Sequence, residues 1–298
     1  MFDFFKQLFK KDEPLSEIDV QTTPLSNEQV KSIEKEVNIH TPPQLLVGSA
    51  QSVGMQRDHN EDTLYTLNAM FADGRNDTPF GIFIVADGMG GHQNGEVASS
   101  VAARTMAEFL INHLYSKVLG TKSGGQIESL HEIMEEGVRE AQDAVLKNAP
   151  GGGTTLTAAL VMGERVTIAH VGDSRAYFIH PDGRMRAITK DHSLVRRLIE
   201  LGQINEEEAA VHPQRNVLYR ALGQLEPFRP EVNTHLLPHP GYLMLCSDGL
   251  WGVVGDTEIF RIVTKNPDPS NACQQLVAAA NAAGGPDNIS AILVQYLE

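Results

Sequence analysis

The sequence predicts an α+β protein in which strands form stacked layers and helices lie outside them. Two observations support this fold class. Short apolar runs rich in β-branched residues recur along the chain and end in glycine-containing turns, as buried strands do. The elements also come in groups, strand meanders followed by paired helices, without the regular strand and helix alternation of a doubly wound parallel sheet.

The stretch from residue 80 to residue 92 shows this pattern most clearly. Its apolar part, residues 80–86, predicts a strand buried on both faces, and it ends in Asp87-Gly-Met-Gly-Gly-His92. Asp-Gly is a favoured hairpin turn, but no second strand follows at hairpin distance. Apolar residues at helical spacing follow instead, over residues 95–114. We therefore expect a strand, a glycine loop and a helix, with Asp87 exposed at a rim.

The other elements are predicted from the same two signals. Short apolar runs bounded by turn residues indicate strands, and apolar residues three or four positions apart indicate helices. Further strands are expected near residues 45–48, 64–70, 154–162, 165–171, 176–179, 184–188, 241–247 and 289–296. Further helices are expected near residues 126–148, 193–201, 256–264 and 270–283. We interpret the strands between residues 154 and 188 as one antiparallel meander, and the polar segment from residue 202 to residue 220 as an excursion above the core.

Composition limits the functional classes. The 298 residues carry 24 Lys and Arg against 38 Asp and Glu, a net charge of −14, which argues against a nucleic-acid partner. Cys246 and Cys273 lie in apolar segments and are expected to be buried thiols without a disulfide or a zinc ion. No apolar run is long enough for a membrane span, and no signal peptide is recognisable. A cytoplasmic location is therefore expected.

Residues 1–43 are predicted to be a tail and linker ahead of a folded domain at residues 44–298. The first eleven residues place Phe2, Phe5, Leu8 and Phe9 on one helical face beside lysines, which is compatible with docking on a membrane or a partner. We prefer a frayed tail, because so short a helix is marginal by itself. A short helix is expected near residues 27–37.

Acidic residues at strand ends are the candidates for chemistry. Four aspartates share a position between an apolar strand and a glycine-containing turn: Asp87, Asp173, Asp248 and Asp287. Carboxylates gathered near a core repel one another unless cations or protons neutralise them. With Glu61 and Asp62 added, all the donors are hard oxygens, which favours Mg²⁺ or Mn²⁺, and their number predicts two ions. Any one of these acids alone is explained equally well as a cap or turn residue.

Eight short motifs occur in order along the chain: Arg57-x-x-Asn60-Glu61-Asp62, Val85-Ala-Asp87-Gly-Met-Gly-Gly-His92, Gly153-Thr-Thr155, Gly172-Asp-Ser-Arg175, Thr189-x-Asp-His-Ser193, Arg220-Ala-Leu-Gly223, Ser247-Asp-Gly249 and Gly285-Pro-Asp-Asn288. Together they resemble the type 2C metal-dependent protein serine/threonine phosphatases (the PPM family), particularly the bacterial branch. The resemblance implies a four-layer α/β/β/α sandwich of two antiparallel sheets flanked by helices. It also implies that residues 44–298 form the catalytic domain, with a flap over about residues 191–220.

The resemblance implies roles for the acidic residues. Asp87 would bridge two metal ions, and Gly88 would offer its backbone carbonyl. Asp248 and Asp287 would hold the first ion.

For the second ion, the resemblance implies Asp62, with Glu61 acting through water. A third, weaker ion would use Asp173 together with Asp248. Arg57 would bind the substrate phosphate through its guanidinium fork, which matches an oxyanion better than the point charge of a lysine.

The activity implied is hydrolysis of phosphoserine and phosphothreonine in proteins by hydroxide at a two-ion Mn²⁺ or Mg²⁺ centre, without a phosphoenzyme intermediate. Such an enzyme would oppose a serine/threonine kinase in bacterial signalling. Two alternatives stay open, another two-metal phosphoesterase and a catalytically weak phosphoprotein-binding regulator. Eukaryotic members tend to have a histidine where this chain has Met89, so the proton donor is left open between His92, which is as readily explained as a structural residue, and a metal-bound water. His192 and His212 receive no catalytic role. The sequence does not predict an oligomeric state.

Overall fold

The computed structural model describes residues 24, 26, 41–72, 77–90, 93–118, 129–224 and 229–298. By its internal contacts the chain divides into Met1–Thr41 and Pro42–Glu298, and the second unit contains everything described below. The predicted helix near residues 27–37 falls outside the described residues, as do the tail phenylalanines and His92. None of the described helices is long and apolar enough to cross a membrane.

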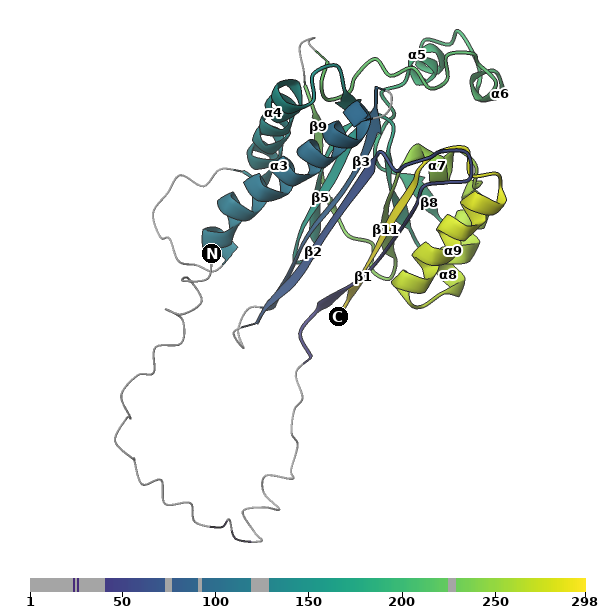
Figure 1. Ribbon diagram of the computed structural model, residues 1–298. Coiled ribbons are helices and arrows are strands. Elements are labelled where there is room, and N and C mark those ends of the chain that lie inside the picture. The colour runs from purple at the N-terminus through teal and green to yellow at the C-terminus, as the bar shows by residue number, and fades with distance from the viewer. Residues whose placement is uncertain are drawn as a thin grey trace. The chain divides into compact units, whose positions relative to one another are not determined.

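Two antiparallel sheets pack against each other, and helices cover both outer faces (Figure 1). One sheet has the order β1 (Gln44–Ser52), β11 (Ile289–Leu297), β10 (Tyr242–Cys246), β7 (Arg175–Ile179), β8 (Met185–Ala187). The other has the order β2 (Asp62–Ala72), β3 (Asp77–Met89), β5 (Leu156–Met162), β6 (Arg165–Val171), β9 (Glu231–Leu236). A two-residue strand, β4 (Gly153–Thr154), pairs with the end of β3.

The helices complete the outer layers. The β2–β9 sheet is covered by α3 (Gln93–Val118) and α4 (Leu130–Asn148), and the β1–β8 sheet by α7 (Asp248–Trp251), α8 (Asp256–Lys265) and α9 (Pro269–Ala282). Two short helices, α5 (Leu194–Glu200) and α6 (Glu206–Ala210), lie in the flap region beyond the sheets (Figure 1). The predicted α/β/β/α sandwich is confirmed.

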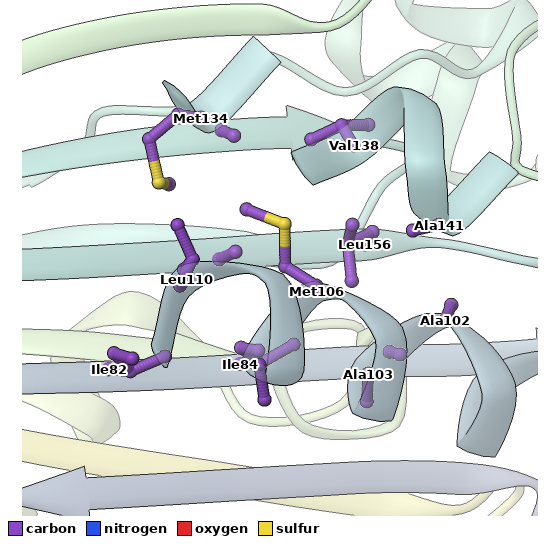
Figure 2. Packing of buried hydrophobic residues seen from close by; sticks show 14 of the residues in the cluster. Ile82, Ile84, Ala102, Ala103, Met106, Leu110, Met134, Val138, Ala141 and Leu156 are labelled. Carbon is purple, nitrogen blue, oxygen red and sulfur yellow. The ribbon is translucent and has the colours of Figure 1, made fainter. Parts of the chain in front are cut away.

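The alternating faces of β3 explain its unbroken apolar run. Ile82 and Ile84 pack in the cluster beneath α3 and α4, whereas Phe83 and Val85 pack in the cluster between the two sheets. Figure 2 shows the first of these clusters, which contains Met106 of α3 as well as Ile84. Because both faces of the strand are buried, every position from 82 to 86 is apolar.

The prediction of one strand meander over residues 154–188 was wrong. β5 pairs with β6 in one sheet, whereas β7 pairs with β8 in the other. The chain changes sheets just after β6 at Gly172, whose φ is 108°. A Cβ there would lie 2.5 Å from the Cγ2 of Thr155, so glycine suits this tight passage. Hydrophobic periodicity indicates strands but does not indicate which sheet each strand joins.

Other predicted boundaries also differ. The predicted glycine loop starts later, because β3 continues to Met89, where Gly88 and Met89 pair with β4. The helix expected from residue 126 is described from Leu130, capped by Ser129. β9 was not predicted, since it is a mostly polar strand at a sheet edge, with a single buried residue. Cys246 and Cys273 are buried and free, as predicted.

Candidate metal centre

The strand-end aspartates meet at one edge of the two sheets. Asp62 begins β2 and lies directly opposite Asp87 near the end of β3. Asp248 follows β10 and Asp287 precedes β11, and these two strands are antiparallel neighbours, so the end of one lies beside the start of the other. Like charges directly opposite one another in a strand pair are destabilising. The Asp62 and Asp87 pair therefore indicates a position that a cation would neutralise.

A cleft of about 400 Å³ opens at this edge. Its lining includes seven of the eight predicted site residues: Arg57, Glu61, Asp87, Gly88, Asp173, Asp248 and Asp287. The eighth, Asp62, is buried and does not line the cleft. Met89 lines it as well, together with Asn216 and Leu218 from the flap.

Asp62 is the most enclosed of the predicted ligands. Its Oδ2 accepts hydrogen bonds from Ser247 Oγ at 2.8 Å and from Ser290 Oγ at 2.7 Å. Its Oδ1 is buried without a hydrogen-bond partner. The pKa of Asp62 is raised to about 7, chiefly by burial and also by the nearby Asp248 carboxylate, whereas the hydrogen bonds from the two serines lower it. Asp62 Oδ1 therefore lacks the hydrogen-bond partner that a buried polar atom normally has.

A second oxygen of this kind belongs to Asp248, whose Oδ1 is also buried without a partner. Burial, and then the charge of Asp287, raise the pKa of Asp248 to about 6. Burial likewise raises the pKa values of Asp87 and Asp173 well above the ordinary range, with neighbouring carboxylates adding to the effect. The cleft therefore concentrates negative charge that protons or cations must balance.

The donor set fits a hard divalent cation. Every candidate ligand offers carboxylate or carbonyl oxygen, and two of the carboxylate oxygens lack a partner. In the part of the chain that the structure describes, no group of three or more His, Cys, Asp or Glu side chains is arranged to hold a metal ion as it stands.

Arg57 and Glu61 come from the loop between β1 and β2. Arg57 Nη2 donates to Asp287 Oδ2 at 2.7 Å, so the ion-pair partner of Arg57 is the predicted metal ligand Asp287. Its side chain is about half exposed in the cleft. Glu61 Oε1 lies 3.1 Å from His59 Nε2.

Sequence reasoning missed the residues that hold this loop and Asp87. Asn288 accepts a hydrogen bond from the Glu61 amide at 2.8 Å and donates to the carbonyls of Val53 and His59. Thr155 Oγ1 accepts from the amide of Asp87 at 2.9 Å. Both residues belong to the recognised motifs, but nothing in their type or spacing indicated these bonds.

His192 has a structural role. Its side chain is completely buried, and its Nδ1 accepts a hydrogen bond from the amide of Gly172 at 3.0 Å. The ring therefore braces the turn before Asp173.

The sandwich fold and the acidic cleft agree with those of the family that the motifs resemble. Comparison with known proteins identifies that family. The family model for protein phosphatase 2C matches residues 47–289, and the chain belongs to this family. The serine/threonine phosphatase stp of Listeria innocua is 38% identical over 249 residues, which cover 81% of this chain and 92% of that protein. This chain is accordingly a serine/threonine protein phosphatase of a metal-dependent family.

Solved structures agree. The Mycobacterium tuberculosis serine/threonine phosphatase PstP/Ppp is similar with a TM-score of 0.69 at 30% identity, covering 85% of this chain and 98% of that one. A structure of the catalytic domain of PstP in complex with two manganese ions has a TM-score of 0.68 at 29% identity, covering 86% and 100%.

Proposed function

We propose that this phosphatase uses two divalent ions, Mn²⁺ or Mg²⁺, held in the acidic cleft to hydrolyse phosphoserine and phosphothreonine in proteins. The observation that carries the proposal is the pair of buried, unpartnered oxygens, Asp62 Oδ1 and Asp248 Oδ1, at one sheet edge. The PstP complex with two manganese ions supports it. When bound, two such ions lower the pKa of a water molecule and screen the charge of the phosphate.

The arrangement of the chain suggests how the ligands divide. Asp87 lies opposite Asp62 in the strand pair, which suits a carboxylate shared between two ions, and Gly88 would add its backbone carbonyl. Asp248 and Asp287 would serve the first ion. The second would use Asp62.

The remaining assignments concern the rim of the cleft. Glu61 would assist Asp62 through water, and Asp173 with Asp248 would hold a third, weaker ion. Arg57 is half exposed and has one ion-pair partner among the described residues, so its guanidinium can exchange Asp287 for phosphate oxygens. Met89 has no proton to donate, and we propose that a solvent water protonates the leaving oxygen. Direct attack by water needs no phosphoenzyme intermediate.

We also propose a cellular setting. Residues 44–298 would act as the catalytic domain in the cytoplasm, on proteins phosphorylated by a serine/threonine kinase. The described part of the flap, with Asn216 and Leu218 at the cleft, would shape access for such substrates.

The test compares a phosphothreonine peptide with a bis-phosphodiester, using the purified full chain with Mn²⁺, with Mg²⁺ and with EDTA. We expect hydrolysis of the peptide with added Mn²⁺, loss of this hydrolysis in EDTA, and little reaction of the diester. Hydrolysis that survives chelation would exclude the metal mechanism. Preference for the diester would indicate another two-metal phosphoesterase, and binding of the peptide without turnover would indicate a phosphoprotein-binding regulator.

A further inference from the structure

Arg175 lies beside the acidic cleft, and all parts of its guanidinium are engaged. Nε donates to Asp191 Oδ1 at 2.9 Å and Nη2 to Asp191 Oδ2 at 2.7 Å, forming a two-point ion pair. Nη1 donates to Tyr177 Oη at 3.0 Å. The flat face of the group lies 3.4 Å from the centre of the Trp251 ring. A planar fork held at this many points has little freedom to move.

Trp251 connects Arg175 to the predicted metal ligand Asp173, because it contacts both residues. The indole Nε1 donates to the backbone carbonyl of Asp173 at 3.0 Å, while Arg175 covers the face of the ring. Trp251 also ends α7, the helix that begins with Asp248. It is the single tryptophan of the sequence, so its fluorescence reports on this position alone.

The start of the flap holds the same turn from the other direction. The amide of His192 donates to the carbonyl of Gly172 at 2.7 Å, and the amide of Gly172 donates to the His192 ring. Asp191, the partner of Arg175, directly precedes His192 in the chain. Two groups therefore hold the turn that carries Asp173: the start of the flap and Trp251. Arg175 contacts both, because it binds Asp191 at the start of the flap and stacks on Trp251.

A second cavity, of about 300 Å³, lies beside these groups. Its lining includes Asp173, Arg175, Asp191 and Trp251, together with residues of α5 and α6 in the flap. The flap helices therefore face the linked groups across a space. A displacement of the flap that moves Asp191 would strain the two-point ion pair and, through the stacked indole, the carbonyl of Asp173.

We propose that Arg175 is a positioning residue that couples the start of the flap to Asp173 and thereby sets how tightly the cleft binds a divalent ion at Asp173. This inference rests on the proposed function, because it takes Asp173 as a metal ligand. Residues that orient metal ligands typically alter metal affinity by about 10-fold to 100-fold when they are replaced.

The test uses Arg175→Lys, which keeps the charge but loses the fork and the stacking surface. Arg184→Lys is the matched control, because Arg184 is exposed and its ion pair with Asp182 is confined to a hairpin turn. Mn²⁺ is titrated into the metal-free full chain by calorimetry and by Trp251 fluorescence. We expect Arg175→Lys to weaken the weakest Mn²⁺ binding step by roughly tenfold, and Arg184→Lys to match the wild type.

Kinetics separate positioning from a general loss of structure. In Arg175→Lys the Mn²⁺ concentration for half-maximal hydrolysis should rise by a similar factor, while saturating Mn²⁺ restores kcat and leaves the KM for the phosphopeptide unchanged. Unchanged Mn²⁺ binding would overturn the proposal. A lowered kcat that Mn²⁺ does not restore, accompanied by a lower melting temperature, would also overturn it.

Trp251→Phe supplies an independent variant should Arg175→Lys fail to fold. It keeps an aromatic ring for Arg175 but removes the N–H group that reaches Asp173, and calorimetry should show the same weakening of Mn²⁺ binding. Wild-type Mn²⁺ affinity in Trp251→Phe would contradict the proposal. If the wild-type chain binds Mn²⁺ but hydrolyses no phosphopeptide, the proposed function fails, whereas calorimetry of the variants still decides the coupling.

Discussion

At the scale of single residues, Asp248 is a proposed metal ligand whose burial is unfavourable in the absence of a cation. One of its oxygens is buried without a partner, and burial together with Asp287 raises its pKa to about 6. Asp248→Asn keeps the shape but removes the charge. We expect Mn²⁺-dependent turnover to fall by more than about a hundredfold. In EDTA the variant should melt at the same temperature as the wild type or a higher one, because repulsion with Asp287 is relieved.

Asp256→Asn is the matched control for this prediction. Asp256 is an exposed residue in the first turn of α8, and its replacement should leave turnover unchanged. Steady-state kinetics and melting curves with and without EDTA measure both variants. A wild-type rate in Asp248→Asn would show that the ligand assignment is wrong, and a large fall in its melting temperature would indicate a structural role instead.

The acidic residues of the cleft could be predicted from the sequence, but the residues that hold them could not. Each strand-end aspartate is marked locally by the apolar run beside it. The serines that bind Asp62 lie 185 and 228 positions away in the chain. Sheet pairing brings them together, and pairing between distant strands leaves no trace in local periodicity. The hydrogen bonds of Asn288 and Trp251 could not be predicted for the same reason, because they also join distant parts of the chain.

At the scale of secondary-structure elements, the packing of α9 on β1 depends on a residue without a side chain. A Cβ on Gly48 would overlap the backbone of Pro269 and Ser270, which begin α9. This backbone is fixed by Asp268, which accepts hydrogen bonds from the first amides of the helix. Gly48→Ala should therefore lower the free energy of unfolding by about 3 kcal/mol, measured by urea denaturation.

Gly255→Ala controls for the loss of a glycine as such. No atom lies within 4 Å of a Cβ built there, and its φ of −66° is ordinary for alanine. Its effect should stay within roughly 1 kcal/mol, the typical difference between glycine and alanine at a helix N-cap. Equal effects of the two variants would refute the packing argument.

Elements with two buried faces or a clear amphipathic stripe were predictable, and those without were not. β3 and α4 show their periodicity directly in the sequence, because each packs against a large apolar cluster. β9 has one buried residue and therefore little pattern. The chain passes from β6 to the other sheet, where β7 and β8 lie, through a tight turn at Gly172. Because glycines also occur in ordinary loops, the sequence did not indicate this passage.

At the scale of the whole domain, the proposed metal site lies where the two sheets meet. Asp62 and Asp87 come from one sheet, whereas Asp248 and Asp287 flank strands of the other. Neither sheet alone supplies the full donor set, so the cleft exists only in the assembled sandwich. The apolar cluster between the sheets holds these repelling carboxylates together.

His170 makes the stability of this assembly sensitive to acid. The ring is buried in β6, its Nε2 donates to the Lys190 carbonyl at 3.1 Å, and its Nδ1 lies 2.9 Å from Thr157 Oγ1. Burial, and then the neighbouring His192, lower the pKa of His170 from 6.5 to about 4, although Asp191 and Glu231 oppose this. The bonds of His170 thus join one sheet to the segment that precedes the flap.

The sign of the pH effect follows from the two pKa values. Between pH 6.5 and about 4 the unfolded chain binds a proton at His170 and the folded chain does not, so stability is lost as the pH falls through this window. The full loss is on the order of 3 kcal/mol. His170→Gln cannot titrate, so in urea unfolding with EDTA the wild type should lose more stability than this variant between about pH 7 and about pH 4.5. Parallel losses in the two proteins would show that His170 accepts its proton in the folded state, contrary to the burial that keeps the ring neutral.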